Sequence, residues 1–222
     1  MRKRTNQKKL LKQLYRILLK YYGPQHWWPA ETEFEVVVGT ILTQNTAWSN
    51  VEKSIEQLKK ENALNPSAVS GISMRKLQML IRSSGFFKAK SKRLKEIASR
   101  YNEIKETYWM PIDEGRENLL SIKGIGPETA DSILLYAGNQ PTFVIDAYTK
   151  RFSKRFGLVD AENSQDYGKV KSFFEDNVEC DAELFNEWHA LIVKHSKEYC
   201  KKKPKCTACP LSEGCEKVFT GE

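Results

Sequence analysis

The chain has 222 residues, of which 40% are hydrophobic and 29% charged, a composition typical of a soluble globular protein. A chain of this length can bury a sizeable core, as one large domain or two small ones. No apolar run approaches the roughly 18 to 20 residues that a membrane span needs, which argues against an integral membrane protein. The N-terminus lacks an apolar stretch with a small-residue cleavage site, so we expect no secretory signal.

The net charge of +8 is concentrated at one end of the chain. Residues 1–20 hold eight basic residues and no acid, and the rest of the chain holds 28 residues of each sign. A basic stripe of this kind suits a polyanion such as nucleic acid. The stretch is also typical of a solvated amphipathic helix, and the two interpretations are compatible. The basic residues are Arg2, Lys3, Arg4, Lys8, Lys9, Lys12, Arg16 and Lys20.

Apolar residues recur at helical spacing along most of the chain, and no segment alternates like a convincing strand. The first helix is expected to stop at Gly23 and Pro24, and Thr32 with Glu35 predicts a capping box for the second. The short run 142–145 could be extended. The fold class is therefore all-α, with helices expected over about residues 5–22, 34–42, 47–61, 74–83, 90–106, 114–121, 127–137, 146–156, 165–178 and 181–197.

Two of the predicted helices are joined by a short glycine turn. Leu119 and Leu120 close the first helix, and Pro127 opens the second at the position that proline favours. Glycines permit a positive φ and a close approach to a ligand, and N–H groups before a helix N-terminus bind anions such as phosphate. The alternative is an ordinary helix–turn–helix corner that needs its glycines for tight packing. The candidate phosphate-binding residues are Lys123, Gly124, Ile125 and Gly126.

Four of the five cysteines crowd into the last 23 residues, with five, two and five residues between them. Without an export signal, crowded cysteines favour a metal site over disulfides. Four thiolates can hold a [4Fe–4S] cluster or a tetrahedral zinc, and the spacing does not decide between them. Cys180 stands apart and is expected to be a core residue or an idle thiol. The candidate ligands are Cys200, Cys206, Cys209 and Cys215.

The loop between the first two of these cysteines is rich in cations. Pro204 stiffens it, and a metal bound by the cysteines would pin it at both ends. A pinned cationic loop is a plausible second clamp for DNA phosphates. Its lysines are Lys201, Lys202, Lys203 and Lys205.

Several further motifs follow one another along the chain. They are Phe34-Glu35 leading to Leu42-Thr43-Gln44-Asn45-Thr46, Gly85-Phe86-Phe87 with Lys90, the glycine turn, Val144-Ile145-Asp146, Trp188-His189, His195 and the four cysteines. In this order they resemble the endonuclease III superfamily of helix-hairpin-helix DNA glycosylases. The resemblance runs almost from end to end, and it is closest in motif to the 3-methyladenine DNA glycosylase branch.

The resemblance implies a helical domain over about residues 31–140, with the hairpin at about 119–130. A second helical domain would combine residues 1–30 with 141–222, with a DNA cleft between the two. In relatives the cysteine loop holds one [4Fe–4S] cluster, which favours iron–sulfur over zinc here. Asp146 matches the family's essential aspartate, which would stabilise positive charge on the sugar and orient water. Asp146 is also expected to be a helix N-cap, a role compatible with catalysis.

The chain departs from the family pattern at two places. Bifunctional relatives carry a lysine where this chain has Glu128, and that lysine forms the Schiff base that allows strand cleavage. A carboxylate cannot do this, so the resemblance implies a monofunctional enzyme without AP-lyase activity, which leaves an abasic site. The first cysteine spacing is also one residue shorter than usual, which could shift the lysines of that loop or tune the stability of the cluster.

A base must leave the DNA stack before it can be removed. Gln44 matches a residue that fills the gap in the duplex in relatives, although it could be a polar helix-end residue. Trp27, Trp28 and Pro29 resemble a pocket segment of the 3-methyladenine branch, and an indole face suits a cationic alkylated purine. The tryptophans could instead form a hydrophobic staple. Glu128 could line the pocket or be a solvated residue of the first helical turn.

The sequence therefore predicts a DNA glycosylase of base excision repair that removes an alkylated purine such as 3-methyladenine. Two alternatives stay open: a glycosylase for oxidised or mismatched pyrimidines, and a DNA-binding relative without catalysis. The expected partner is double-stranded DNA with a damaged base. We expect a monomer in the cytoplasm, associated with the nucleoid and not with a membrane.

Overall fold

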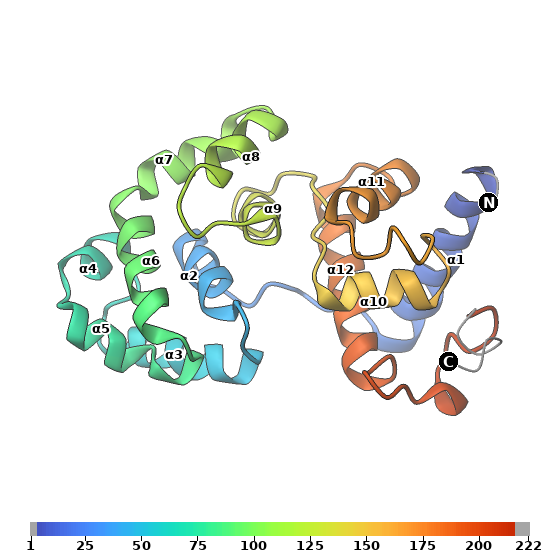
Figure 1. Cartoon of the computed structure of the whole chain (residues 1–222), viewed down its shortest axis with the longest axis horizontal. Coiled ribbons are helices and arrows are strands. Elements are labelled where there is room, and N and C mark those ends of the chain that lie inside the picture. The colour runs from blue at the N-terminus through green and yellow to red at the C-terminus, as the bar shows by residue number, and fades with distance from the viewer. Residues whose placement is uncertain (1–3, 216–222) are drawn as a thin grey trace. The chain divides into compact units, whose positions relative to one another are not determined.

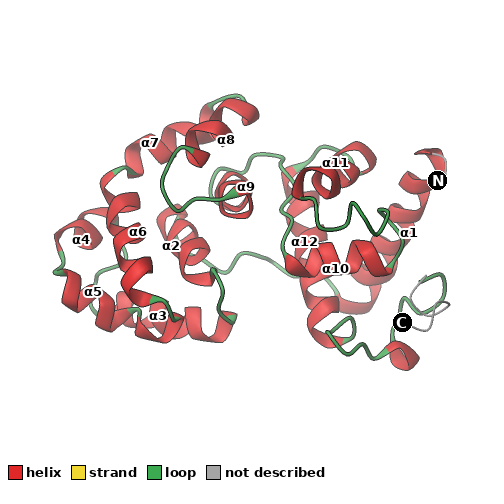
Figure 2. Cartoon of the chain, in the orientation of Figure 1, coloured by secondary structure: helices red, strands yellow, loops and turns green. Residues whose placement is uncertain are grey.

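The computed structural model describes residues 4–215, which form helices and loops with no strand among them (Figure 2). The all-α prediction is therefore confirmed. The helices are α1 (Arg4–Tyr22), α2 (Glu33–Thr43), α3 (Trp48–Lys60), α4 (Pro66–Gly71), α5 (Met74–Leu80), η1 (Arg82–Ser84), α6 (Phe87–Ser99), α7 (Tyr101–Glu106), η2 (Thr107–Trp109), α8 (Ile112–Leu120), α9 (Pro127–Tyr136), α10 (Ala147–Arg155), α11 (Tyr167–Asn177), α12 (Ala182–Glu198) and η3 (Cys206–Ala208).

The chain divides into two compact units (Figure 1). Trp28–Gln140 forms the first, which we call the hairpin unit because it contains α8 and α9. The segments before and after it form the second, the terminal unit. None of the helices in the described part of the chain is long and apolar enough to cross a membrane.

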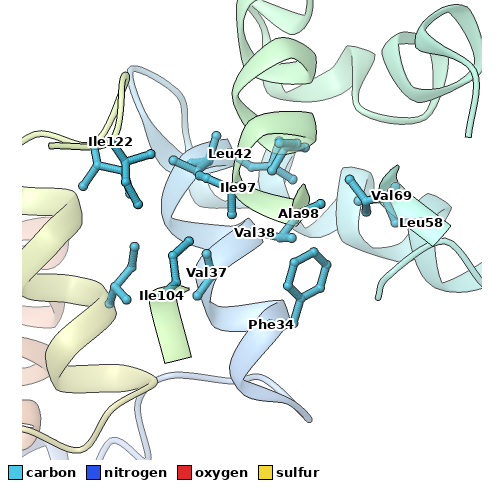
Figure 3. Close-up of a cluster of buried hydrophobic side chains, with 14 of the residues drawn as sticks. Phe34, Val37, Val38, Leu42, Leu58, Val69, Ile97, Ala98, Ile104 and Ile122 are labelled. Carbon is cyan, nitrogen blue, oxygen red and sulfur yellow. The ribbon is translucent and has the colours of Figure 1, made fainter. Parts of the chain in front are cut away.

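Helix α2 is the centre of the hairpin unit. Every residue from Phe34 to Leu42 is buried, which is typical of a helix enclosed on all sides. It packs against α3, α6 and α9. Figure 3 shows its side chains lying among apolar residues from the surrounding segments, which include Leu58, Val69, Ile97, Ala98, Ile104 and Ile122.

The start of α2 differs in one detail from the predicted capping box. The hydroxyl of Thr32 accepts a hydrogen bond from the Glu35 N–H at 3.1 Å, as predicted. The Glu35 carboxylate, however, accepts from the N–H of Glu31 at 3.1 Å and forms an ion pair with Lys59 at 2.9 Å. The cap is therefore built from the predicted residues. The Glu35 carboxylate, however, bonds to the N–H of Glu31 and not to that of the cap residue Thr32.

The prediction of one helix over residues 90–106 was wrong in two respects: the helix starts earlier, and it is divided into two. Helix α6 already begins at Phe87, because Phe86 adopts a left-handed conformation with φ 44° and starts the helix there. At Arg100 the backbone leaves the helical region, with φ −105° and ψ 15°, and α7 follows as a separate helix. The break precedes Tyr101, whose ring packs edge-on against Phe34 at 4.9 Å. The short helix α4, capped by Asn65, was not predicted at all.

The terminal unit combines the two ends of the chain. Helix α12 packs against α1 and α10, and α1 also packs against α11. Its core includes Trp188, and Phe143 stacks on Phe174 with ring centroids 4.3 Å apart. The segment 142–145 runs irregularly into α10 and forms no strand. Cys180 is exposed, so its interpretation as a core residue was wrong.

Helix α1 is amphipathic, as its leucine spacing predicts. Leu11, Leu14 and Leu18 are buried, with exposed fractions of at most 3%. The basic residues with described side chains all lie on the exposed side: Lys8, Lys9, Lys12, Arg16 and Lys20. Arg2 and Lys3 lie outside the described residues.

Candidate active site

The hairpin between α8 and α9 is a tight turn anchored by two isoleucines. Ile122 and Ile125 are buried, and the Ile125 N–H donates to the Ile122 carbonyl at 3.0 Å. Lys123 is exposed between them. Gly124 adopts φ 95°, which favours glycine, whereas Gly126 is extended, with φ −101° and ψ 179°. Only the first glycine is therefore required by backbone conformation.

The N–H groups of the two turn glycines are available to a ligand, whereas that of Ile125 is not. Gly124 and Gly126 donate to no carbonyl of residues 4–215. Gly126 caps α9, whose first-turn N–H groups have no partner within the helix. A Cβ added at Gly126 would meet no atom within 4 Å, so the space in front of it is open. These are the features of an anion site at a helix N-terminus.

A buried ion pair holds the two helices of the hairpin together. The guanidinium of Arg116 on α8 donates to both carboxylate oxygens of Asp131 on α9, at 2.8 and 3.2 Å. The Asp131 side chain is fully buried, and that of Arg116 is 24% exposed. A two-pronged contact of this kind restricts the angle between the helices more than a single bond would.

Gln44, at the end of α2, contacts the hairpin directly. Its amide nitrogen donates to the Gly124 carbonyl at 3.2 Å and to the Thr129 hydroxyl at 3.1 Å. Its amide oxygen accepts from the guanidinium of Arg93 on α6. The Gln44 side chain is half-buried, and it is followed by Asn45 at φ 53°. The sequence pattern around Gln44 does not predict these partners.

The turn before α6 presents an exposed aromatic ring, that of Phe86 in the Gly85-Phe86-Phe87 motif. Phe86 is 70% exposed and has φ 44°, a strained conformation for a bulky residue. Strained backbone of this kind often marks a functional segment. A large exposed ring on a left-handed residue is visible only in the structure, since no residue type in the sequence predicts it.

Asp146 caps α10 in the terminal unit. Its Oδ1 accepts from the Thr149 N–H at 2.7 Å and from the Thr149 hydroxyl at 3.0 Å. Its Oδ2 lies 3.6 Å from Nε2 of His189 on α12, and the Asp146 side chain is 15% exposed. The predicted cap is confirmed, and His189 is the neighbour that the spacing alone could not identify.

These contacts keep the Asp146 carboxylate ionised. Burial by itself would raise the pKa of Asp146, because a charge is costly in a poorly solvated site. The neighbouring His189 imidazole and the hydrogen bonds from Thr149 outweigh that cost and lower the pKa below its ordinary value. At neutral pH the site therefore holds a fixed negative charge.

The two predicted pocket tryptophans belong to different compact units. In the hairpin unit, Trp28 packs edge-on against Trp48 with centroids 5.0 Å apart, and its ring centroid lies 5.1 Å from that of Tyr136. Its indole also covers Gly39, where an added Cβ would meet the ring at 3.0 Å. Trp48 and Tyr136 thus extend the aromatic surface beyond the predicted residues.

The other predicted pocket residues are half-buried or exposed. Trp27, in the terminal unit, is half-buried, and the Lys197 ammonium lies 5.8 Å from its ring centroid. Pro29 is exposed. Glu128 is exposed in the first turn of α9, where an acid suits the helix dipole.

The four clustered cysteines line one pocket of the terminal unit. Its empty space, including solvent at its mouth, is about 400 Å³. Cys200, Cys206, Cys209 and Cys215 all contribute to its wall, together with His195. As they stand, no three His, Cys, Asp or Glu side chains within residues 4–215 form a group that could hold a metal ion. The cationic loop residues Lys201, Lys202, Lys203 and Lys205 are exposed.

The cysteine loop is tied to the helix that Asp146 caps. From α10, Arg151 donates to the Cys200 carbonyl at 2.8 Å, and Arg155 donates to the carbonyls of Lys201 and Lys202. The Arg155 guanidinium also approaches the Cys200 sulfur at 3.5 Å. Helix α10 therefore connects the carboxylate at its start to the cysteine loop at its end.

His195 is part of the wall of the cysteine pocket. Its Nε2 is 3.6 Å from the Cys209 sulfur, and its Nδ1 is 3.2 Å from the Tyr22 hydroxyl. Burial lowers the pKa of His195 to about 4, so the ring is neutral at physiological pH. Burial also raises the pKa of the Cys209 thiol, to about 11.

Comparison with known proteins identifies the family of this chain. Residues 38–180 match the family described as HhH-GPD superfamily base excision DNA repair protein. A candidate DNA repair glycosylase of Methanocaldococcus jannaschii is 46% identical over 96% of this chain and 98% of its own length. The structure of 3-methyladenine DNA glycosylase from H. pylori, bound to 1,N6-ethenoadenine, is 32% identical with a TM-score of 0.73, covering 86% of this chain and 97% of that one.

A complex of endonuclease III with DNA has the same fold. Its protein chain is 20% identical to this one, with a TM-score of 0.81 over 96% of this chain and 97% of that chain. At this level of identity the match concerns the fold alone.

The two glycines of the hairpin offer a direct test of the turn. We expect Gly124→Ala to lower the melting temperature, because the residue has φ 95° and the new Cβ would lie 2.8 Å from Arg93. We expect the melting temperature of Gly126→Ala to lie within about 2 °C of that of the wild type. The backbone conformation at this position suits any residue, and the added Cβ would contact no other atom. Equal destabilisation by the two changes, measured by calorimetry, would contradict the observed turn.

Proposed function

We propose a reaction for this chain, which belongs to the HhH-GPD superfamily of base excision DNA repair proteins and is a DNA glycosylase of that family. The reaction is hydrolysis of the N-glycosidic bond of an alkylated purine such as 3-methyladenine in double-stranded DNA. It leaves an abasic site in an uncut strand. The observation that carries the proposal is an ionised, capped Asp146 in a chain that has Glu128 where a lyase has its lysine.

Asp146 is the proposed catalytic residue. Cleavage of an N-glycosidic bond builds positive charge on the sugar, and a fixed carboxylate stabilises that charge. One oxygen of Asp146 is held by Thr149, and the other, which lies beside His189, would face the sugar or orient the attacking water. His189 supports this role because it helps keep the carboxylate ionised.

The hairpin and the cationic loop are the proposed DNA contacts. Lys123 and the N–H groups of Gly124 and Gly126 lie at a turn that leads into a helix N-terminus, and they would hold one backbone phosphate. Ile125, whose own N–H closes the turn, would contribute to this contact by anchoring the turn between the two glycines. Such contacts position the protein on the duplex without reading sequence. The second phosphate clamp would be formed by Lys201, Lys203 and Lys205.

Gln44 and Phe86 are proposed to act on the duplex once it is bound. Gln44 would fill the space that the extruded base leaves. Phe86 adds an exposed ring that can stack on a neighbouring base, a contact that tolerates any sequence. Both residues lie in the hairpin unit, which also carries the phosphate-binding turn.

The substrate assignment rests on aromatic residues and on similarity. An indole face attracts a cationic alkylated purine by about 0.5 to 2 kcal/mol. Trp27, Trp28 and Pro29 would contribute to the base pocket, and Glu128 would line it. Trp27 already has one cation near its ring, Lys197, which supports its capacity for this kind of contact. The 32% identity to a 3-methyladenine DNA glycosylase supports the same substrate class.

A [4Fe–4S] cluster is the proposed occupant of the cysteine pocket. All four thiols line the same pocket, and soft thiolate donors suit iron–sulfur chemistry. The cluster would be held by Cys200, Cys206, Cys209 and Cys215, and it would fix the lysine loop between the first two. Its role would be structural, in keeping with the contacts that α10 makes to this loop.

Asp146→Asn separates catalysis from folding, because asparagine caps helices as well as aspartate does. We expect it to slow base release by roughly 10² to 10⁴-fold, since the fixed charge is lost. Affinity for duplex DNA should be unchanged, and the melting temperature should fall only slightly, because the cap is kept and only the stabilising charge is lost. The matched control is Asp181→Asn, which alters the cap of α12 and should keep full activity. Full activity of Asp146→Asn would refute the catalytic role.

Analysis of the free bases tests the substrate class. Incubated with DNA treated with a methylating agent, the protein should release 3-methyladenine. With oxidised, deaminated or mismatched DNA it should release no thymine glycol, uracil or thymine. The opposite pattern would favour a pyrimidine glycosylase, and release of no base despite normal duplex binding would favour a relative without catalysis.

Metal analysis tests the cysteine pocket. Anaerobically purified protein should contain about four iron atoms and four sulfides per chain and absorb visible light. Cys206→Ser should lose most of the iron, whereas Cys180→Ser should keep it, because Cys180 lies outside the cluster of four. Zinc in place of iron in the wild type would contradict the proposal.

A further inference from the structure

Two cations on α6 hold the loops that border the hairpin. Lys90 and Arg93 lie about one turn apart on that helix. Lys90 is only 1% exposed, and the partners of its ammonium given by the structure of residues 4–215 are backbone carbonyls and not carboxylates. A buried ammonium without a counter-ion is costly. An apolar side chain of similar length would avoid that cost. The hydrogen bonds that the ammonium makes therefore have to explain why a lysine stands at this position.

The Lys90 ammonium donates to two backbone carbonyls from different segments. It lies 2.8 Å from the carbonyl of Leu42 and 2.6 Å from that of Ser84. Leu42 precedes Gln44 by two residues, and Ser84 precedes Phe86 by two residues. Both carbonyls lie at helix ends, where they lack intrahelical partners. One side chain therefore fixes the base of the Gln44 loop relative to the base of the Phe86 turn.

Arg93 extends this connection to the hairpin. Its guanidinium donates to the Gln44 amide oxygen, and its side chain lies so close to Gly124 that an added Cβ would meet it at 2.8 to 3.0 Å. The Gln44 amide nitrogen donates to the Gly124 carbonyl and the Thr129 hydroxyl. The Gln44 loop, the Phe86 turn and the phosphate-binding turn are thus connected through α6.

We propose that Lys90 and Arg93 are positioning residues for base extrusion. They hold Gln44 and Phe86 at a fixed distance from the hairpin. A duplex whose phosphate is bound by the hairpin therefore has its bases within reach of both side chains. Neither cation touches the reacting atoms. The inference rests on the proposed function, in which Gln44 fills the gap left by the base.

The test compares binding to two duplexes, one undamaged and one with a tetrahydrofuran abasic-site analogue. Insertion of Gln44 into the gap raises the affinity only for the abasic duplex, whereas phosphate contacts raise the affinity for both duplexes. We expect the wild type to prefer the abasic duplex. Lys90→Met and Arg93→Met should each reduce that preference by roughly tenfold while changing the affinity for undamaged DNA by less than about twofold. Gln44→Ala should show the same pattern.

The matched control is Lys95→Met on the same helix. Lys95 also donates to two backbone carbonyls, those of Ser70 and Ile72, but these lie away from the Gln44 loop and the Phe86 turn. It should keep the wild-type preference. If the Lys90→Met protein does not fold, the test relies on Arg93→Met, because Arg93 is only half-buried and its replacement disturbs the core less.

Three outcomes would overturn the positioning role: an unchanged preference in Arg93→Met, equal losses on both duplexes, or a wild type without preference. Base release by the wild type is measured separately on methylated DNA, so failure of the proposed function is distinguished from failure of this inference.

Discussion

The hairpin unit depends on the turn at Gly124. Its positive φ allows Ile122 and Ile125 to point into the core from both sides of the turn while Lys123 stays exposed. The missing Cβ also leaves room for the Arg93 side chain, and the Gly124 carbonyl accepts from Gln44. One small residue therefore permits both the local conformation and the contacts that join neighbouring segments to it.

The terminal unit combines stability and chemistry in the same bonds. The contacts from Thr149 that cap α10 also lower the pKa of Asp146, so the charge proposed for catalysis results from an ordinary helix start. The other end of α10 holds the cysteine loop through Arg151 and Arg155. Helix α10 thus joins the proposed catalytic group to the proposed cluster, and these contacts support a structural role for the cluster.

The sequence predicted what depends on local pattern. Helix periodicity predicted the all-α class, the burial of the α1 leucines and the cap at Asp146, because each follows from residues a few positions apart. It could not predict the break at Arg100 or the left-handed Phe86, because tertiary packing determines them. The bonds of Gln44 to Gly124 and of Lys90 to Leu42 join residues 80 and 48 positions apart. Spacing along the chain carries no signal for such pairs.

The central claim is that the reaction stops at base removal, because no lysine occupies the position of Glu128. Borohydride reduction in the presence of damaged DNA measures this directly, since it traps a Schiff base between an amine and the sugar. An endonuclease III, for which a trapped covalent DNA intermediate has been solved, is the positive control. We predict no covalent complex and a strand that breaks only after alkaline treatment. A trapped adduct would show that another amine replaces the missing lysine and would contradict the account.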